Sequence, residues 1–447
     1  MIQGLIGVAV IVIGIAASIA LHEAGHLIPA KRFGVKVTQF MIGFGPTIWS
    51  RRRGETEYGL KAIPLGGFVR MIGMFPPRPG DDPTMLRASS TGRFSQLADQ
   101  ARKESAEEVA PEDADRVFYK LSPWRKIVIM LGGPVTNLVI ASVLIGGVLT
   151  LYGRDEVLPR VSEVTTCVPS GTPTLKQLTP ACLPTDPSSP AKAAGLQTGD
   201  TVVSVDGAPV STWAQVTAKI RAHTAGPMTL VVDRAGQQVS LTATLATRKA
   251  PVFDADGNPV LSNGVIATET VNFLGMAPSV VAVRQPVTAV PGVVWDYLSR
   301  TASVVTRIPE KMVGVAQAVF GGAERDPNGP SSVVGVGRAG YEIGSVGLGD
   351  SGRGFAATMA TLVMLVALLN LALFAFNLIP LLPLDGGQVV GAMWEAVKRG
   401  AARLLGRPDP GPVDVAKALP LAYAVSVLLL LMSVLLMYAD IVKPISM

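Results

Sequence analysis

The chain has 447 residues, of which 49% are hydrophobic and only 16% are charged. This composition is too apolar for a set of soluble domains and predicts a membrane protein. The formal net charge of +6 is small for this length, and the Lys and Arg residues form no nucleic-acid-binding motif. We therefore expect the lipid bilayer, and no nucleic acid, as a partner.

Four apolar stretches are long enough to cross roughly 30 Å of hydrocarbon, which takes about 20 helical residues. They cover residues 2–28, 126–152, 356–386 and 418–438. Lys and Arg are denser between the first two stretches than between the second and third, and they recur after the third. By the positive-inside rule those two loops are cytoplasmic. Both termini and the region from about 153 to 355 are then expected outside the cytoplasm.

A cleaved signal peptide is the alternative interpretation of the first stretch, because Ser18-Ile19-Ala20 resembles a cleavage site. No basic residue precedes the apolar run, and the cut would fall just before His22. We therefore expect the first stretch to remain as a span.

The first stretch contains the strongest chemical signal, His22-Glu23-Ala24-Gly25-His26. A helix brings residues i and i+4 to one face, so His22 and His26 are expected to bind one Zn²⁺ ion while Glu23 holds a water. Ionisable side chains inside a span are costly and usually functional. The alternative is a pair of histidines buried for packing. His223, the remaining histidine, is expected at a surface.

Two short strands, 58–63 and 66–71, are predicted after the first span, joined as a hairpin around Pro64-Leu65-Gly66-Gly67. Its apolar content suggests that it dips into the membrane, where non-helical backbone survives only against protein or a water-filled cavity. The alternative is a hairpin on the cytoplasmic surface. An edge strand here would pair with an unwound substrate, so Gly66, Gly67, Phe68 and Val69 are candidate substrate-binding residues.

Residues 76–116 are polar and predict a mobile cytoplasmic insert. Beyond the second span, strands are expected at 202–207, 228–232 and 239–245 with a helix at 213–222, which together form a small α+β domain. Cys167 and Cys182 lie at its entry. In an oxidising compartment they favour a disulfide, and two free thiols are the alternative.

Apolar runs at 289–324 are interrupted by charges, which predicts an interfacial amphipathic helix rather than a fifth span. A catalytic zinc ion usually has three protein ligands, so one is missing from the first span. Asp385 lies in apolar surroundings near the end of the third stretch, where Pro380 and Pro383 are expected to break the helix. A zinc ion would provide its partner. The alternative is a helix that emerges into the cytoplasm at Asp385.

The motifs that contain these residues resemble those of the site-2 proteases, a family of intramembrane zinc metalloproteases. Within this family they resemble the bacterial branch whose cleavage activates alternative sigma factors. The His22 to His26 motif is similar to the family's zinc motif, and Leu384-Asp385-Gly386 is similar to its third-ligand motif. The segment 132–137, Gly-Gly-Pro-Val-Thr-Asn, also resembles a family pattern. The stretch 194–207 resembles the family's extracytoplasmic PDZ domain. The resemblance spans nearly the whole chain.

The resemblance implies that His22, His26 and Asp385 ligate zinc and that Glu23 is the general base and then the acid. It also implies that Asn377 helps to hold the substrate or the transition state. Some relatives have a second asparagine nearer to Asn377, where this chain has Ala372, so no role is carried over to Asn370. The implied substrates are single-pass membrane proteins such as anti-sigma factors or signal-peptide remnants.

The expected fold is a polytopic α-helical membrane protein with about four transmembrane helices, a membrane-associated β-hairpin and an inserted extracytoplasmic α+β PDZ-like domain, in a bacterial plasma membrane. The PDZ-like domain is either a peptide binder or a size filter. A zinc transporter and an inactive scaffold are the alternative functions. A transporter is disfavoured by the small number of spans and the single metal cluster, and a scaffold by the presence of Glu23. The expected segments are 1–32, 33–75, 76–125, 126–152, 153–250, 251–355, 356–390, 391–417 and 418–440.

Overall fold

The chain forms two compact units in the computed structural model, Met1–Thr150 with Pro286–Met447, and Leu151–Gln285. The structure describes residues 2–76, 100, 102, 105, 107, 109–174, 178, 180–224, 226–253, 259–262, 265–322, 325–326, 329–347 and 354–445. Most of the predicted polar insert, residues 77–99, lies outside the described residues. Each unit is considered by itself.

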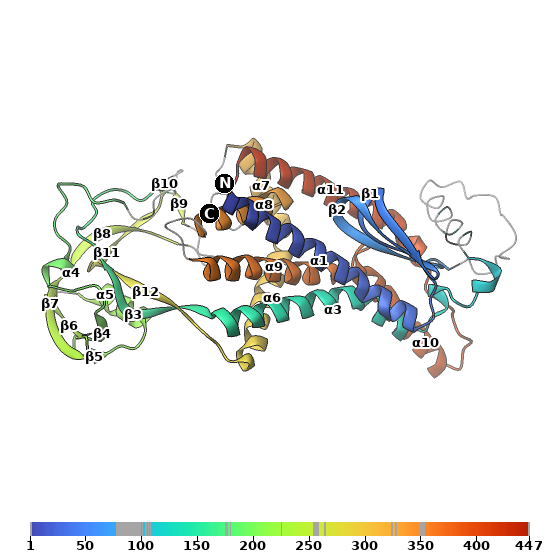
Figure 1. Cartoon of the computed structure of the whole chain (residues 1–447), viewed down its shortest axis with the longest axis horizontal. Helices are drawn as coiled ribbons and strands as arrows, with labels where there is room; N and C mark the ends of the chain where they lie inside the picture. The colour runs from blue at the N-terminus through green and yellow to red at the C-terminus, as the bar shows by residue number, and fades with distance from the viewer. Residues whose placement is uncertain are drawn as a thin grey trace. The chain divides into compact units, whose positions relative to one another are not determined.

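Within the described residues, four helices of the first unit are long and apolar enough to cross a membrane, as predicted (Figure 1). The bounds of these helices are Ile2–Arg32 for α1, Pro123–Gly147 for α3, Phe355–Asn377 for α9 and Leu419–Val442 for α11. A π turn, η3 (Val148–Tyr152), continues α3, and a 3-10 turn, η5 (Val415–Ala418), precedes α11. The prediction of four helices that could span a membrane is confirmed.

Glycines let α1 approach its neighbours closely. A Cβ atom on Gly25 of α1 would lie 2.3 Å from the carbonyl oxygen of Gly132 on α3, so the two backbones touch at that crossing. Near its other end, α1 packs against α8 (Val333–Gly347), where a Cβ on Gly7 would lie 2.0 Å from the carbonyl oxygen of Gly340. Small residues at a crossing are typical of helix packing in membranes.

The third span ends earlier than predicted. α9 stops at Asn377 and is followed by a non-helical segment, 378–384, that contains Pro380 and Pro383. A separate helix, α10 (Asp385–Leu404), then begins at Asp385. The predicted helix break is confirmed, whereas the segment expected as a plain loop, 391–417, is helical as far as Leu404 and again in η5.

Along the chain, the described residues form three further α-helices between β12 (Met276–Val283) and α9. α6 (Val290–Thr306) follows a 3-10 turn, η4 (Val287–Ala289), and α7 (Ile308–Phe320) follows α6. The single helix predicted over 289–324 is therefore two helices that meet at Arg307, and α8 was not predicted. Asp440 of α11 pairs with Arg325 at 2.5 Å and accepts hydrogen bonds from the backbone of the segment that enters α8.

The sheet after α1 is larger than the predicted hairpin. β1 (Val37–Arg53) pairs antiparallel with β2 (Thr56–Met71), and the chain turns at residues 54–55 rather than at the predicted residues 64–67. The first part of β1 lies between the two predicted strands, because Met41 pairs with both Gly59 and Phe68. Those two strands therefore do not pair with each other. The final part of β2, from Gly67 onward, is paired on one side only within the described sheet.

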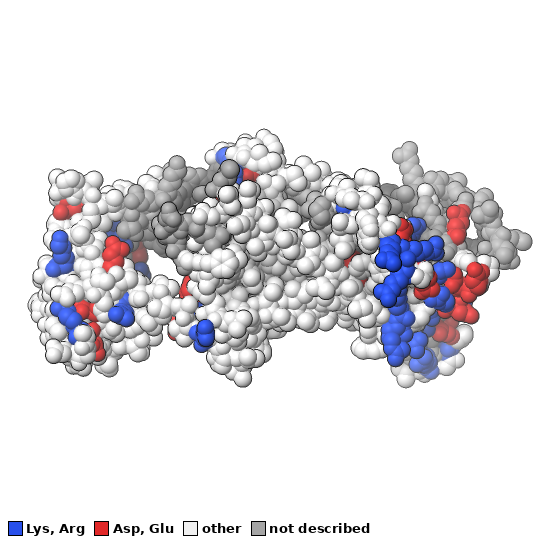
Figure 2. Space-filling model, in the orientation of Figure 1, with Lys and Arg blue, Asp and Glu red and all other residues white. Residues whose placement is uncertain are grey.

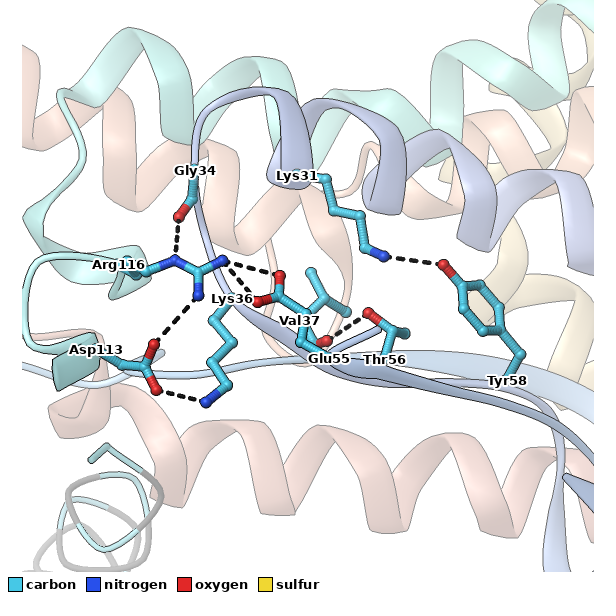
Figure 3. A network of polar contacts seen from close by, with 9 residues as sticks. All are labelled: Lys31, Gly34, Lys36, Val37, Glu55, Thr56, Tyr58, Asp113 and Arg116. Carbon is cyan, nitrogen blue, oxygen red and sulfur yellow. Dashed lines mark hydrogen bonds and ion pairs between the residues drawn. The ribbon is translucent and has the colours of Figure 1, made fainter. Parts of the chain in front are cut away.

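A polar network fastens the turn end of this sheet to the end of α1 (Figure 3). Arg116 donates to the backbone oxygen of Gly34, forms an ion pair with Glu55 of the β1–β2 turn and bonds Asp113, which also accepts from Lys36. The Lys36 hydrogen bond holds the pKa of Asp113 below its usual range. Asp113 ends a 3-10 turn, η1 (Pro111–Asp113), and a second such turn, η2 (Phe118–Lys120), leads to α3. The sheet is thus held at a fixed place beside α1.

The second unit contains a sheet with the order β12-β3-β4-β6-β7, and β5 pairs with β4. Its strands are β3 (Arg154–Val164), β4 (Thr201–Val205), β5 (Ala208–Pro209), β6 (Pro227–Arg234), β7 (Gln237–Thr244) and β12 (Met276–Val283). Two smaller sheets pair β8 (Ala246–Pro251) with β11 (Thr268–Phe273) and β9 (Leu261–Ser262) with β10 (Val265–Ile266). Its helices are α4 (Pro190–Ala193) and α5 (Trp213–Ala222).

The predicted strands and helix of the α+β domain correspond to β4, α5, β6 and β7. The unit continues beyond the expected end at residue 250, because β12 pairs with β3 across most of the unit's length. Its apolar core is formed by one face of the sheet and by α5, and it includes Val205, Val216 and Leu230, none of which is exposed. Cys167 and Cys182 are joined by a disulfide at the edge of this unit.

Candidate metal and catalytic site

The helix α1 and the first residue of α10 bring three metal-binding side chains together. One helical turn separates His22 from His26, and their Nε2 atoms lie 3.3 Å apart. The Asp385 carboxylate lies 3.4 Å from the Nε2 atom of His22 and 3.5 Å from that of His26. The three donor atoms all lie within 4.8 Å of one another.

The helix α3 fixes the orientation of both imidazole rings from behind. Nδ1 of His26 donates to the backbone oxygen of Ile129 at 2.8 Å. Nδ1 of His22 lies 3.0 Å from the side-chain amide of Asn137, whose other polar atom is buried without a hydrogen-bond partner among the described residues. The amide nitrogen of Asn137 is the atom that faces Nδ1 in this structure; exchanging the positions of the amide nitrogen and oxygen allows Nδ1–H of His22 to donate to the oxygen. Both Nε2 atoms then present a lone pair to the site, as metal ligation requires.

Gly133 of α3 provides the space that the two rings occupy. A Cβ at this position would lie 2.3 Å from Nε2 of His26 and 2.6 Å from Nε2 of His22. The preceding residue, Gly132, makes the close crossing with Gly25 described above. The backbone of α3 therefore approaches α1 within one turn of both histidines, and no side chain stands between them.

The side chain of Glu23, on α1, lies between this helix and the sheet. A Cβ on Gly67 of β2 would lie 2.8 Å from Cγ of Glu23, so the strand backbone passes directly over this side chain. Gly66 has a φ of +106°, a conformation that favours glycine, and a Cβ there would meet the Phe44 ring at 2.6 Å. The sheet therefore approaches Glu23 through Gly67, and Gly66 gives the adjoining backbone its positive φ.

The other sequence-predicted residues are placed around this centre or away from it. Phe68 stacks on Phe44 with ring centroids 6.4 Å apart, and Val69 packs against the apolar cluster at the base of the sheet. Asn377 ends α9 and is half-buried, and its side chain forms no hydrogen bond with another described residue. The disulfide-bonded Cys167 and Cys182 belong to the second unit.

Asn370 is separate from the histidine cluster. It is 1% exposed, and its side-chain amide donates to the hydroxyl of Ser18 on α1 and to the backbone oxygen of Val366 on its own helix. Its contacts join α9 to α1 one helical turn before His22. These contacts pack α9 against α1.

The sequence did not assign roles to Asn137, Gly133 or the carbonyl of Ile129. A signal for two of them was present, because the segment Gly-Gly-Pro-Val-Thr-Asn at 132–137 places Gly133 and Asn137 at i and i+4 on one helical face. The carbonyl of Ile129 is a backbone group, and the sequence carries no information about its partner.

The donor set fits a zinc ion. Two imidazole nitrogens and one carboxylate oxygen are a ligand combination of catalytic zinc sites, which leave one position for water or substrate. Each imidazole has a partner for its other nitrogen. Glu23 lies in the same turn of α1 as the two histidines. The fold and the site together define a zinc metalloprotease embedded in a membrane.

Comparison with known proteins identifies the family. Residues 10–404 match Peptidase family M50. The chain is 33% identical over 449 residues to "Zinc metalloprotease Rip1" of Mycobacterium tuberculosis, with 98% of each chain covered. It is 25% identical over 454 residues to "Zinc metalloprotease RasP" of Geobacillus kaustophilus, covering 89% of this chain and 91% of the other. The chain belongs to peptidase family M50, the site-2 proteases, and it is a bacterial membrane zinc metalloprotease.

Proposed function

We propose that this protein hydrolyses peptide bonds within the transmembrane segments of single-pass membrane proteins, using a zinc ion held by His22, His26 and Asp385. The convergence of these three side chains from α1 and α10 beside Glu23 is the observation that carries the proposal. Zinc, when bound, polarises a carbonyl group and increases the acidity of water. The chain's own residues orient the reactants and move the protons.

Glu23 is the proton carrier in this mechanism. Its carboxylate accepts a proton from the attacking water and then delivers that proton to the nitrogen of the leaving amine. The backbone of β2 at Gly67 covers Glu23 on one side, which limits access to the carboxylate. Asn377, at the end of α9, is available to hold the substrate carbonyl or the transition state.

The substrate is held as an added strand. The part of β2 from Gly67 onward pairs with β1 on one side only within the described sheet, and it begins at the residue that contacts Glu23. An unwound substrate segment that pairs with Phe68 and Val69 would enter the site in an extended form, with its backbone hydrogen bonds satisfied. Extended backbone is what a protease needs in order to reach an amide that a helix would bury.

The orientation in the membrane follows from charge. Figure 2 shows Lys and Arg gathered over the end of the first unit that carries β1 and β2, while the adjoining helical surface on this face is almost uncharged. We assign this basic end to the cytoplasm. The second unit, a PDZ-like domain, and both termini are then extracytoplasmic, where the Cys167–Cys182 disulfide is stable.

The PDZ-like unit acts as a size filter or as a peptide binder, and one excision distinguishes them. Arg154 and Val283 are register partners at the ends of β3 and β12, so residues 155–282 can be replaced by a short Gly-Ser linker without pulling the spans apart. Under the filter model, the excised enzyme cleaves substrates with untrimmed outer domains. Complete loss of cleavage favours the binder. The chemical class of substrate is a single-span protein, such as an anti-sigma factor or a signal-peptide remnant.

The test of the proposed function pairs zinc content with cleavage. Wild type and Glu23→Gln are purified in detergent, and each is measured for bound zinc and for cleavage of a single-span model substrate. We expect both to hold one zinc ion and only the wild type to cleave. Equal cleavage by both proteins, or no zinc in either, would refute the proposal. Zinc import into vesicles without cleavage would instead indicate a transporter.

A further inference from the structure

A buried ion pair joins α3 to α10 away from the zinc-binding side chains. Nζ of Lys126, near the start of α3, lies 2.8 Å from the Glu395 carboxylate on α10, and the two side chains are only 7% and 2% exposed. Arg399 contacts the second oxygen of Glu395 at 2.9 Å, and the backbone N–H of Val413 donates to the first at 3.1 Å. The Glu395 carboxylate is therefore held from three directions.

Both members of this pair lie on the helix faces that build the zinc-binding site. Going along α3, steps of four, three and four residues keep one face in register. These steps lead from the ion pair to the residues that surround the histidines, through Lys126, Met130, Gly133 and Asn137, all of which are buried. On α10, one face runs from the partly exposed Asp385 at the first position through Val389 and Ala392 to Glu395, and the last three are buried.

The position of Asp385 depends on how α10 lies against α3. The segment before α10 is not helical, and no side chain caps the N-terminus of α10. The two histidines are already fixed to α3 by Ile129 and Asn137. The carboxylate is the one ligand that comes from a separate helix, and Lys126–Glu395 is the buried ionic contact between that helix and α3 in the described structure.

We propose that Lys126 and Glu395 are positioning residues that set the tilt and rotation of α10 on α3, and thereby place Asp385 against His22 and His26. The inference rests on the proposed role of Asp385 as a zinc ligand. Ten residues of helix separate Asp385 from Glu395, a lever of about 15 Å. A tilt of about 4° over that lever moves Asp385 by about 1 Å, whereas zinc–ligand distances tolerate only about 0.2 Å.

Stability alone is a weak reason for such a pair. Moving two charges out of water is costly, and an apolar pair of similar volume often stabilises a fold equally well. What an ion pair adds is direction, because the ammonium group must meet the carboxylate at a defined place. The expected signature is a loss of zinc affinity that exceeds the loss caused by an equally buried ion pair elsewhere.

The chain offers that matched control. Arg325 and Asp440 form a second buried pair, with side chains 4% and 2% exposed, between α11 and the segment before α8. Neither residue contacts α10 in the described structure. The test set is Glu395→Gln, Lys126→Met and the apolar double variant Lys126→Met/Glu395→Met, with Asp440→Asn and Arg325→Met as controls. The full-length proteins in detergent are stripped of metal, and the zinc Kd is measured by competition with a chromophoric chelator.

We expect at least a tenfold increase in the zinc Kd for Glu395→Gln and Lys126→Met, and less than a twofold change for the controls at a similar loss of thermal stability. In an Asp385→Asn background, Glu395→Gln should cause no further weakening, because its effect passes through Asp385. The apolar double variant keeps the packing of α10 on α3 but loses the directional ion pair. Its zinc Kd should therefore rise even if the single variants fail to fold.

Two results would overturn the inference: wild-type zinc affinity in the apolar double variant, or an equal loss from Glu395→Gln with and without Asp385. The proposed function fails by a different result. If Asp385→Asn alone leaves the zinc Kd of the wild-type protein unchanged, then Asp385 is not a ligand, whatever Lys126 and Glu395 do.

Discussion

Replacing Gly133 with alanine tests whether the backbone of α3 sets the geometry of the zinc-binding site. The added Cβ would lie 2.3 Å from Nε2 of His26 and 2.6 Å from Nε2 of His22, and both nitrogens are proposed ligands. Ordinary non-bonded separation is about 3.5 Å, so the rings must retreat by about 1 Å. They cannot do so freely, because hydrogen bonds to Ile129 and Asn137, on the same face of α3, hold the rings against this helix.

The expected effect is large because zinc coordination tolerates little displacement. Ligand distances in zinc sites vary by about 0.2 Å, and a misplacement of about 1 Å costs about 100-fold in rate. We therefore expect Gly133→Ala to weaken zinc binding by at least tenfold and to reduce cleavage about 100-fold. The fold should persist, since alanine is favoured over glycine within a helix.

Gly147→Ala is the matched control for this experiment. Gly147 ends the same helix, and a Cβ there would meet no atom within 4 Å. Both variants are assayed for the zinc Kd by chelator competition, for cleavage of a single-span substrate, and for thermal unfolding. The reasoning is wrong if Gly133→Ala binds zinc and cleaves like Gly147→Ala.

Three other predictions concern the surroundings of the site and the second unit. Asn137→Leu removes the acceptor for Nδ1–H of His22 and should weaken zinc binding by about 10- to 100-fold, whereas Asn137→Asp, which keeps an acceptor, should bind more tightly than Asn137→Leu in the same chelator competition. Successive N–H groups of a strand point to opposite edges, so either Phe68→Pro or Val69→Pro removes a hydrogen-bond donor from the free edge of β2. That variant should cleave substrate more slowly with its zinc content unchanged. Wild-type turnover in both variants would exclude strand addition. Hydrogen bonds from Arg234, at 2.8 Å to each carboxylate oxygen, hold the pKa of Asp200 below its usual 3.8. The ion pair therefore contributes its full stability to the second unit at pH values above the pKa that Asp200 has in the unfolded chain. This contribution is lost as the pH falls through the lower pKa that Asp200 has in the folded unit. When the full-length protein is digested briefly with pepsin at a series of pH values below 4, the second unit should be cleaved less readily at the higher pH values. The Asp200→Asn variant should show a weaker dependence of cleavage on pH.

Local patterns predicted the parts of the fold that depend on near neighbours in the chain. The α5 helix, Trp213–Ala222, was predicted to the residue, because its N-terminal threonine and its apolar spacing are local signals. His22 and His26 were brought together by the helical repeat alone. The convergence of Asp385 on the histidines was also accessible from the sequence, because a carboxylate in an apolar segment needs a partner wherever that partner lies.

Contacts between distant segments were missed. β1 was not predicted because its pattern is interrupted by glycines, a proline and three consecutive arginines, and because its first part is paired with residues on both sides of it. β3 and β12 pair across nearly the whole second unit, which no local pattern encodes. α8 is rich in glycine, which weakens a helical pattern, and no helix was predicted there; its glycines allow close packing against α1.

The separation of the proposed zinc ligands along the chain has a consequence for biogenesis. The histidines lie on the first span and Asp385 follows the third, so most of the polypeptide is synthesised between them. At about 5–20 residues per second, translation leaves tens of seconds during which the two imidazoles exist without the carboxylate. In that interval α3 is already available to close over His22 and His26 through the Gly25–Gly132 crossing. With the proposed ligand set, the order of synthesis makes metal loading a late event that is completed only when α10 docks, because a nascent chain held at the first two spans lacks Asp385.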